Sequence, residues 1–282
     1  MEATPQHHVG VGPLLQAVHS LVTPPSFAAV EPAHADLSYR PRPWPAGVAP
    51  RVDVYLPGGP GPHPSVLLVH GGGFVIGSRG MKPMRYLASR LVEEGFAVAS
   101  IDYRLLFRGA RKLDHGVSDV QAALGWWWEQ RDRFDLDPGA ISLAGLSAGA
   151  TLSLLAAGVS AVPLARVVSV FALYDLSGLS GRLPRLLGRL LSQGSPERLR
   201  QASPLQQPLF PAPLTVLHGT ADGLTPVEQA ERYVARRREA GLPTELHLYE
   251  GQPHGFFNEA TLPIADQAFG DLLAALPRPV LA

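Results

Sequence analysis

Apolar and polar positions along this chain follow two periodicities, which predict alternating strands and helices. Residues Arg51 to Leu56 alternate polar and apolar side chains, the pattern of a half-exposed strand. A continuous apolar run such as Ser65 to Val69 is typical of a strand buried on both faces of a parallel sheet. Further strands are predicted at 96–101, 140–146, 167–173, 214–217 and 245–249, and helices at 84–94, 117–131, 148–157, 227–240 and 264–276. Strand and helix in this order indicate βαβ units around a mostly parallel sheet.

The alternation of strand and helix is absent from two segments. Residues 1–36 are rich in proline and alanine, and we interpret them as an N-terminal arm or cap element. Residues 177–213 mix glycine and proline with arginine- and leucine-rich pieces, which favours an insertion between two strands that forms a small lid. Of the 282 residues, 46% are hydrophobic and 17% charged, so a large buried core is expected. We therefore predict a single α/β domain over residues 1–282, with a lid.

Charge and cysteine content exclude several classes of function. Lysine plus arginine and aspartate plus glutamate each number 24, so the net charge is +0, and no basic run suits a nucleic-acid partner. The chain has no cysteine, which excludes disulfides, thiolate catalysis and cysteine-ligated metals. No histidine pair has the spacing of a metal site, and we expect neither a metal nor a cofactor. The sequence does not decide the oligomeric state, so a homo-oligomer stays open.

One long uncharged stretch resembles a membrane span at first sight. No charged residue occurs between Asp137 and Arg166, but the stretch contains Gly145 and Gly149. These glycines favour a strand, a sharp turn and a buried helix over one continuous apolar helix, so we expect no membrane partner. Residues 1–10 lack a basic patch followed by an apolar run, and we therefore expect a cytoplasmic location.

A Gly-x-Ser-x-Gly pattern at 145–149 supplies the candidate nucleophile, Ser147. The serine lies between an expected strand and an expected helix, where a sharp turn strains the backbone and requires small neighbours. The turn also places the hydroxyl at a helix N-terminus, where backbone N–H groups and the helix dipole favour negative charge. A glycine–serine turn without chemistry is the plain alternative. The strand–turn–helix context favours the nucleophile.

Three consecutive glycines follow the first buried strand, in His70-Gly71-Gly72-Gly73-Phe74. Glycines let the backbone turn so that N–H groups point into a cavity rather than along a sheet. An acyl-transfer enzyme needs such donors where the negative oxygen of the tetrahedral intermediate forms. A loop that binds phosphate is the alternative, but the spacing matches no nucleotide-binding pattern. We expect His70 itself to be a hydrogen-bonded scaffold residue.

A base and an acid complete the predicted chemistry, because a serine hydroxyl needs a base that a third group orients. His254 follows the last expected strand and Asp222 follows the strand before it, so both lie where open α/β sheets build their sites. For Asp222, a turn-forming role is the alternative, and Asp175 is a rival acid at the end of an earlier strand. We expect His218, at the end of its strand, to be structural.

Together these patterns resemble the bacterial esterase and lipase branch of the α/β-hydrolases. The resemblance rests on the segments 70–74, 101–105, 145–149, 218–222 and 254–256, so it covers most of the chain. It implies a mostly parallel central sheet of about eight strands flanked by helices. It also implies that the backbone N–H groups of Gly72, Gly73 and Ala148 form the oxyanion hole. Leu146 and Ala150 depart from the hormone-sensitive-lipase-like pattern, so the chain is at least as similar to feruloyl and acetyl-xylan esterases and kynurenine formamidases.

The favoured hypothesis is a serine hydrolase that cleaves small-molecule carboxylic esters with short to medium acyl groups. Ser147 attacks, His254 transfers the proton and Asp222 orients His254. Phe74, Leu146 and Phe256 are candidates to line an apolar substrate pocket. An amide hydrolase such as an arylformamidase is the alternative within the same chemistry. A non-catalytic ligand-binding protein of the same fold is the alternative from another class. It is disfavoured because such proteins tend to lose the serine or histidine, whereas this chain has every candidate triad residue.

Overall fold

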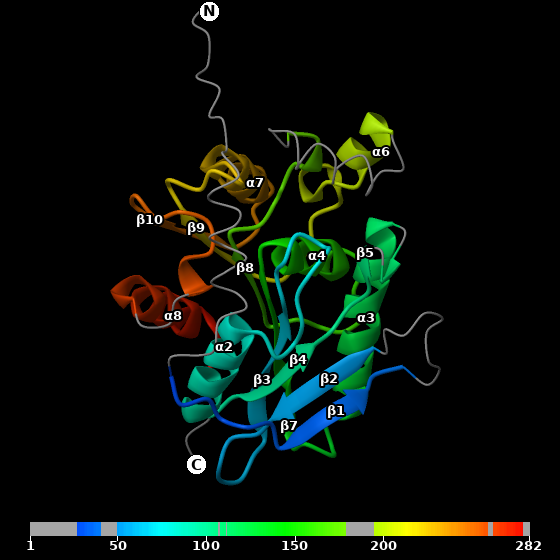
Figure 1. Ribbon diagram of the computed structural model, residues 1–282, viewed down its shortest axis with the longest axis vertical. Helices are drawn as coiled ribbons and strands as arrows, with labels where there is room; N and C mark the ends of the chain where they lie inside the picture. The colour runs from blue at the N-terminus through cyan, green and yellow to red at the C-terminus, as the bar shows by residue number, and fades with distance from the viewer. Residues whose placement is uncertain are drawn as a thin grey trace, which may run out of the picture.

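A central sheet with helices on both faces forms the body of the protein, as a computed structural model shows (Figure 1). The structure describes residues 27–40, 50–106, 108–110, 112–178, 195–258 and 262–278. The strands are β1 (His34–Ser38), β2 (Arg51–Tyr55), β3 (His63–Val69), β4 (Ala97–Ile101), β5 (Leu105–Leu106), β6 (Gly109–Ala110), β7 (Leu136–Leu146), β8 (Arg166–Val170), β9 (Leu214–Gly219) and β10 (Thr244–Tyr249). The helices are α2 (Lys82–Glu93), α3 (Leu113–Glu129), α4 (Ala148–Ala157), α6 (Pro196–Gln201), α7 (Val227–Glu239) and α8 (Pro263–Ala275), with short 3-10 turns η1 (Leu176–Gly178), η2 (Pro204–Gln206) and η3 (Phe256–Asn258).

The main sheet has eight strands in the order β1-β2-β4-β3-β7-β8-β9-β10. In this order the strands from β4 to β10 pair in parallel, whereas β1 and β2 pair antiparallel at one edge. After β3 the chain forms β4 on one side of it and later β7 on the other, so the strand order reverses at β3. The loops that leave β3 and β7 therefore lie side by side at the carboxyl edge, which is where open α/β sheets bind ligands.

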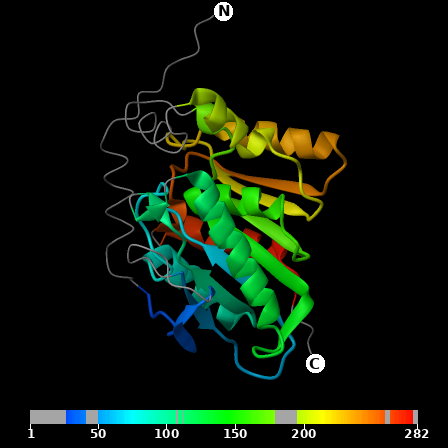
Figure 2. The ribbon, with the colours of Figure 1, turned by 90° about the vertical axis from the view of Figure 1, so that its right-hand side faces the viewer.

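Both faces of the sheet are buried, which explains the continuous apolar runs. In β3, Leu67 and Val69 join a core that also contains residues of α3, α4 and α7. Val66 and Leu68 point the other way, into a core shared with α2 and α8. Figures 1 and 2 show these helices on the two sides of the strands. Successive strand residues face opposite sides, so a strand covered on both sides needs apolar residues at every position.

The expected fold class is confirmed, and the differences from the predicted elements are local. β8 ends at Val170 rather than at residue 173, because Phe171 has a φ of 39° and turns the chain out of the sheet. α3 begins at Leu113, four residues before the predicted start. Its Gly116 lies against Leu152 of α4, since a Cβ there would be 3.0 Å from a leucine methyl. The strand β1 is not predicted by the pattern, because its half-exposed sequence lacks a regular alternation.

The two segments outside the predicted alternation are described only in part. Of the arm 1–36, residues 1–26 lie outside the described residues; beyond them, Val30 donates its N–H to Ser89 of α2 over 2.9 Å, and β1 begins at His34. Of the expected lid 177–213, residues 179–194 lie outside the described residues, so its role stays a prediction. None of the helices in the described part of the chain has the length and apolar character needed to cross a membrane.

Candidate active site

Ser147 occupies a strained turn between β7 and α4. Its backbone has φ 52° and ψ −119°, a conformation that costs a residue with a side chain on the order of 1–3 kcal/mol. The turn is held from both sides, because β7 ends at Leu146, α4 begins at Ala148, and the Ser147 N–H donates to the Val170 carbonyl over 2.8 Å. The hydroxyl is thereby fixed at the N-terminus of α4, at the carboxyl edge of the sheet.

The glycines on either side of Ser147 are required by close backbone approaches. A Cβ on Gly145 would lie 2.5 Å from the carbonyl oxygen of Gly149. A Cβ on Gly149 would lie 2.2 Å from the carbonyl oxygen of Val69, so that α4 could not pack as closely against the end of β3. Distances this short cannot be relieved by side-chain rotation, because the crowded atoms belong to the backbone. The small residues in the pattern thus follow from the geometry of the turn.

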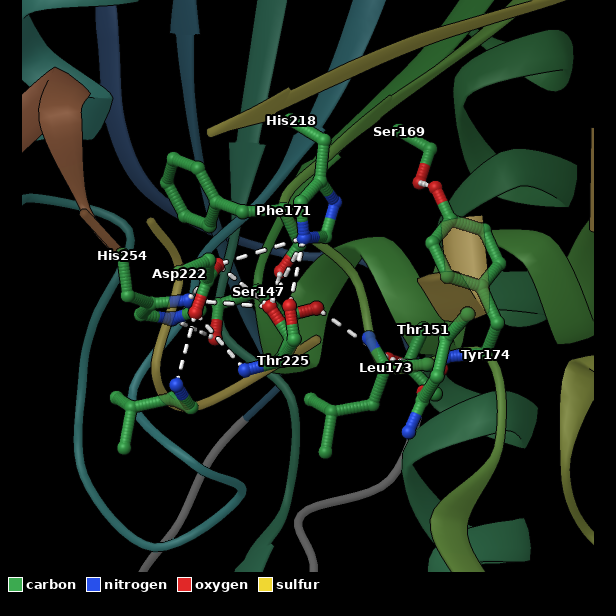
Figure 3. A network of polar contacts seen from close by, with 12 residues as sticks. Ser147, Thr151, Ser169, Phe171, Leu173, Tyr174, His218, Asp222, Thr225 and His254 are labelled. Carbon is green, nitrogen blue, oxygen red and sulfur yellow. Dashed lines mark hydrogen bonds and ion pairs between the residues drawn. The ribbon is translucent and has the colours of Figure 1, made fainter. Parts of the chain in front are cut away.

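Ser147, His254 and Asp222 form one hydrogen-bonded chain (Figure 3). The distance from Ser147 Oγ to His254 Nε2 is 2.8 Å, and that from His254 Nδ1 to Asp222 Oδ2 is 2.8 Å. An ionised carboxylate can only accept, so Nδ1 carries the proton and Nε2 is left to accept the serine hydroxyl proton. The geometry therefore suits proton transfer from Ser147 to His254.

Asp222 is buried and heavily hydrogen-bonded within its own loop. Its Oδ1 accepts from the N–H of Leu224 at 2.9 Å and of Thr225 at 2.8 Å, and its Oδ2 accepts from Thr225 Oγ1 at 2.6 Å. Burial alone raises the pKa of Asp222, but its interactions with His254, and then with His218 and Thr225, outweigh burial and hold the pKa below its ordinary value. The group therefore stays ionised at neutral pH.

The rival acid Asp175 has a different environment. Its Oδ1 accepts from the N–H and the hydroxyl of Ser177, at 3.0 and 2.5 Å, and its Oδ2 lies 4.0 Å from Arg232. Asp222, by contrast, is in direct contact with His254. The contacts of Asp175 are those of a residue that closes a turn.

The glycine-rich loop after β3 turns tightly beside Ser147. Gly72 has a φ of 109°, and its carbonyl accepts the N–H groups of Val75 and Ile76, each at 3.1 Å. A Cβ on Gly72 would lie 2.0 Å from the Ile76 carbonyl, whereas one on Gly73 would have no atom within 4 Å. The loop thus borders open space at Gly73. Across from it, Ala148 is the first residue of α4, so its N–H has no acceptor within the helix.

The Asp-Tyr-Arg sequence at 102–104 supports this loop from behind. Tyr103 donates its hydroxyl to the His70 carbonyl over 3.0 Å, and its ring stacks on the His70 ring with centroids 4.3 Å apart. Asp102 accepts the backbone N–H of Arg79, at the far end of the loop, over 2.7 Å. Burial lowers the pKa of His70, which keeps the ring neutral. The expectation that His70 is a scaffold residue agrees with these contacts.

The three residues suggested for substrate contact lie in different places. Leu146 and Phe256 are 2% and 4% exposed and belong to the core shared with α2 and α8. Phe74 forms part of the wall of a small hollow behind the glycine-rich loop. The other residues around this hollow are Tyr103, Arg104, Leu106, Ala110, Lys112, Leu113, Gly116 and Leu152. A role for any of the three in binding substrate stays a prediction.

Two neighbours of the triad are not identified by the sequence patterns. Thr225 gives Asp222 both its N–H and its hydroxyl, and its position three residues after the aspartate, in an Asx-type turn, is the only signal for it. Phe171 packs against His254 with ring centroids 4.8 Å apart. No pattern indicates Phe171, because its contact depends on the turn after β8 rather than on its neighbours in sequence.

Comparison with known families and proteins finds a family match and esterase relatives. The BD-FAE family model matches residues 52–236. Esterase LipC from Mycobacterium tuberculosis is 33% identical over 218 residues, which are 69% of this chain and 53% of that protein. A probable isoprenylcysteine alpha-carbonyl methylesterase, ICME from Oryza sativa subsp. japonica, is 30% identical over 72% of this chain and 55% of its own length. The chain thus spans about half the length of the curated relatives it matches.

Solved structures share the fold. Esterase B from Lactobacillus rhamnosis, inhibited by a tributyrin phosphonate, superimposes with a TM-score of 0.75, at 18% identity over 94% of this chain and 90% of that chain. Native esterase 2 from Thermogutta terrifontis gives a TM-score of 0.69, at 24% identity over 86% of this chain and 91% of that chain. These likenesses establish the α/β-hydrolase fold.

Proposed function

The chain belongs to the BD-FAE family of the α/β-hydrolase fold, and from this premise we propose that it is a carboxylesterase-type serine hydrolase. Its substrates would be small-molecule carboxylic esters with short to medium acyl groups. The observation that carries the proposal is the unbroken hydrogen-bonded chain from Ser147 Oγ through His254 to Asp222. A nucleophile, a base and an orienting acid in hydrogen-bond contact are the arrangement that acyl transfer requires.

In the first half of the proposed reaction, Ser147 Oγ bonds to the ester carbonyl carbon while its proton passes to His254 Nε2, 2.8 Å away. The carbonyl electrons move onto oxygen, and the N–H groups of Gly72, Gly73 and Ala148 stabilise that charge. The intermediate collapses by breaking the bond to the alkoxy oxygen, which takes the proton from His254 and leaves as an alcohol. Asp222 stays ionised and stabilises the transient imidazolium.

In the second half, water takes the place of the alcohol. It loses one proton to His254 and bonds to the acyl carbon, and the same N–H groups stabilise the oxyanion. Collapse then breaks the bond to Ser147 Oγ, which recovers the proton from His254 and releases a carboxylic acid. Water and ester are thus the only reactants, and no redox partner is needed.

We assign the segment 177–213 to a cover over this site. The support comes from the two described ends of the segment, because residues of the second end hydrogen-bond to the chain just before the first, after β8. Leu176 donates its N–H to Ser203 Oγ over 2.9 Å, and Leu205 donates its N–H to the Tyr174 carbonyl over 2.9 Å. The insertion therefore leaves and rejoins the body next to the turn after β8, whose Phe171 carbonyl lies 3.5 Å from Thr225 Oγ1 in the loop that carries Asp222.

The test compares hydrolysis of p-nitrophenyl acetate, butyrate and octanoate by the wild type and Ser147→Ala. We expect turnover of the shorter esters and a loss of at least ~10³-fold in the variant, as removal of an activated nucleophile causes. Ser160→Ala, on the turn after α4, is the matched control and keeps full activity. A phosphonate ester adds a second readout, because it labels the nucleophile covalently and mass spectrometry then finds the adduct on Ser147. No turnover and no adduct in the wild type would overturn the proposal.

A further inference from the structure

His218 lies next to the triad acid, where the proposed mechanism assigns it no role. It is the penultimate residue of β9, and its side chain is fully buried. Its Nε2 is 2.7 Å from the carbonyl oxygen of Thr225 and 3.5 Å from Asp222 Oδ2 (Figure 3). A carbonyl oxygen only accepts, so His218 Nε2 carries a hydrogen and donates it to Thr225.

We propose that His218 is a positioning residue for the triad acid, acting on Asp222 through the backbone of Thr225. The inference rests on the proposed function and deepens it. His218 itself touches neither Ser147 nor a substrate, so it takes no part in proton transfer. It fixes the end of the loop whose donors determine the orientation of the Asp222 carboxylate.

The contacts of Thr225 explain how this works. The residue is held by His218 at its carbonyl, and it gives its N–H to Asp222 Oδ1 at 2.8 Å and its hydroxyl to Asp222 Oδ2 at 2.6 Å. The Thr225 carbonyl lies in the planar peptide unit that joins Thr225 to Pro226, so the hydrogen bond from His218 anchors the carboxyl side of Thr225 while its N–H and hydroxyl face Asp222. His218, at the end of β9, thus holds the far end of the loop through Thr225. The Asp222 carboxylate in turn accepts two hydrogen bonds from Thr225.

The surroundings of His218 favour its neutral form. Its Nδ1 has no hydrogen-bond partner among the described residues, and burial lowers its pKa, although Asp222, Thr225 and Glu228 oppose that shift. The positive charge that forms on His254 also favours the neutral form. A charged His218 would compete with His254 for the negative charge of Asp222. A neutral donor can orient the acid without weakening its interaction with the base.

Substitutions of His218 can distinguish a hydrogen-bond donor from a side chain that only fills space, because the two roles predict different losses of kcat. The change His218→Gln places an amide N–H at about the reach of Nε2, whereas His218→Met supplies a chain of the same length without a donor. We expect His218→Met to lower kcat for p-nitrophenyl butyrate roughly tenfold with KM unchanged, the scale of one hydrogen bond. We expect His218→Gln to stay within about threefold of the wild type. Circular dichroism and thermal melts test whether each variant folds.

Two further measurements keep the proposal testable if His218→Met fails to fold. His218→Asn carries a shorter amide that cannot reach the Thr225 carbonyl, so it is expected to lose as much kcat as His218→Met. In an Asp222→Ala background, His218→Asn is expected to have no further effect on kcat, because the group that His218 positions is gone. Equal losses for His218→Gln and His218→Asn, or an undiminished effect of His218→Asn without Asp222, would overturn the inference. Activity of the wild type and its loss in Ser147→Ala test the proposed function separately.

Discussion

Thr225 Oγ1 lies 2.6 Å from Asp222 Oδ2, the same carboxylate oxygen that His254 Nδ1 approaches at 2.8 Å. The Thr225 hydroxyl donates its one hydrogen to this oxygen, and His254 Nδ1–H donates a second hydrogen bond to it. Two donors on one oxygen fix its direction toward the base more firmly than either would alone. The orientation of the triad acid is therefore built by its own loop.

The first prediction concerns this hydroxyl. Thr225→Val keeps the shape of the side chain but removes the donor from a buried charge, and we expect kcat to fall by roughly 10- to 100-fold, as a charge-assisted hydrogen bond is worth about 1.5–3 kcal/mol. Thr225→Ser keeps the hydroxyl and is the matched control, with kcat within about threefold of the wild type. Steady-state kinetics with p-nitrophenyl butyrate measure both. Equal rates for the two variants would show that the hydroxyl is dispensable.

The second prediction distinguishes the two candidate acids. Asp222→Asn is expected to lower kcat by about 10⁴-fold, because an amide facing His254 Nδ1 favours the wrong tautomer of the imidazole. Asp175→Asn alters the turn with Ser177 and the contact with Arg232, and it is expected to keep kcat within about twofold of the wild type. The same ester assay measures both variants. A large loss in Asp175→Asn with none in Asp222→Asn would reverse the assignment.

Most of the sheet and the candidate triad could be predicted from sequence, because they leave local signals. Strands buried on both faces appear in the sequence as apolar runs. Ser147 is flanked by glycines at positions where the turn has no room for a larger residue. The end of β8 could not be predicted, since nothing in the apolar sequence shows that Phe171 adopts a positive φ. Nor could the edge strand β1, whose alternation is irregular.

The neighbours of the triad escaped prediction for a different reason. The contacts of His218 with Thr225 and of Phe171 with His254 join separate parts of the chain and leave no spacing to detect, and the only signal for Thr225 is its place three residues after Asp222. A structural role for His218 is expected from its place at a strand end, but the direction of its Nε2 is visible only in three dimensions. The same holds for Phe74, whose position beside a hollow depends on the turn at Gly72.

The third prediction concerns the close approach of α4 to β3. Gly149→Ala brings a Cβ to within 2.2 Å of a backbone carbonyl, so α4 must shift, and we expect a loss of unfolding free energy of several kcal/mol or failure to fold. Gly125→Ala lies in α3 with no atom within 4 Å of the new Cβ, and it is expected to stabilise the protein by about 0.5–1 kcal/mol. Urea unfolding measures both. A destabilised Gly125→Ala or an unaffected Gly149→Ala would contradict this geometry.

The fourth prediction concerns acyl length. Phe74 is buried against the hollow that Leu113 and Leu152 also border, so Phe74→Ala removes part of its wall. If acyl chains enter this hollow, kcat/KM for p-nitrophenyl octanoate is expected to rise relative to that for the acetate by roughly tenfold, the value of one or two buried methylenes. Leu248→Ala, at an exposed site on β10, is the control and leaves the ratio unchanged. An unchanged ratio in Phe74→Ala would place the acyl group elsewhere.

The fifth prediction follows from two histidines buried in a neutral state. Burial lowers the pKa of His70 and of His218, so below about pH 6.5 the unfolded chain binds protons that the folded chain does not. The stability that these neutral rings provide is fully present above the unfolded pKa and is lost as the pH falls from there toward the lowered folded pKa values. Each histidine can add a slope of about 1 kcal/mol per pH unit to the free energy of unfolding.

Urea unfolding at pH 8, 7, 6 and 5 measures this slope. His218→Gln cannot take up a proton, so it is expected to flatten the curve below pH 6.5 by about half, because His70 still contributes. The contribution of Asp222 falls in a separate range, since its pKa lies below the ordinary value and its stabilising effect is lost only as the pH falls further through that lowered value. A curve for His218→Gln that parallels the wild type from pH 8 to 5 would mean that His218 takes up its proton as readily in the folded chain as in the unfolded one, and so is not held neutral beside Asp222.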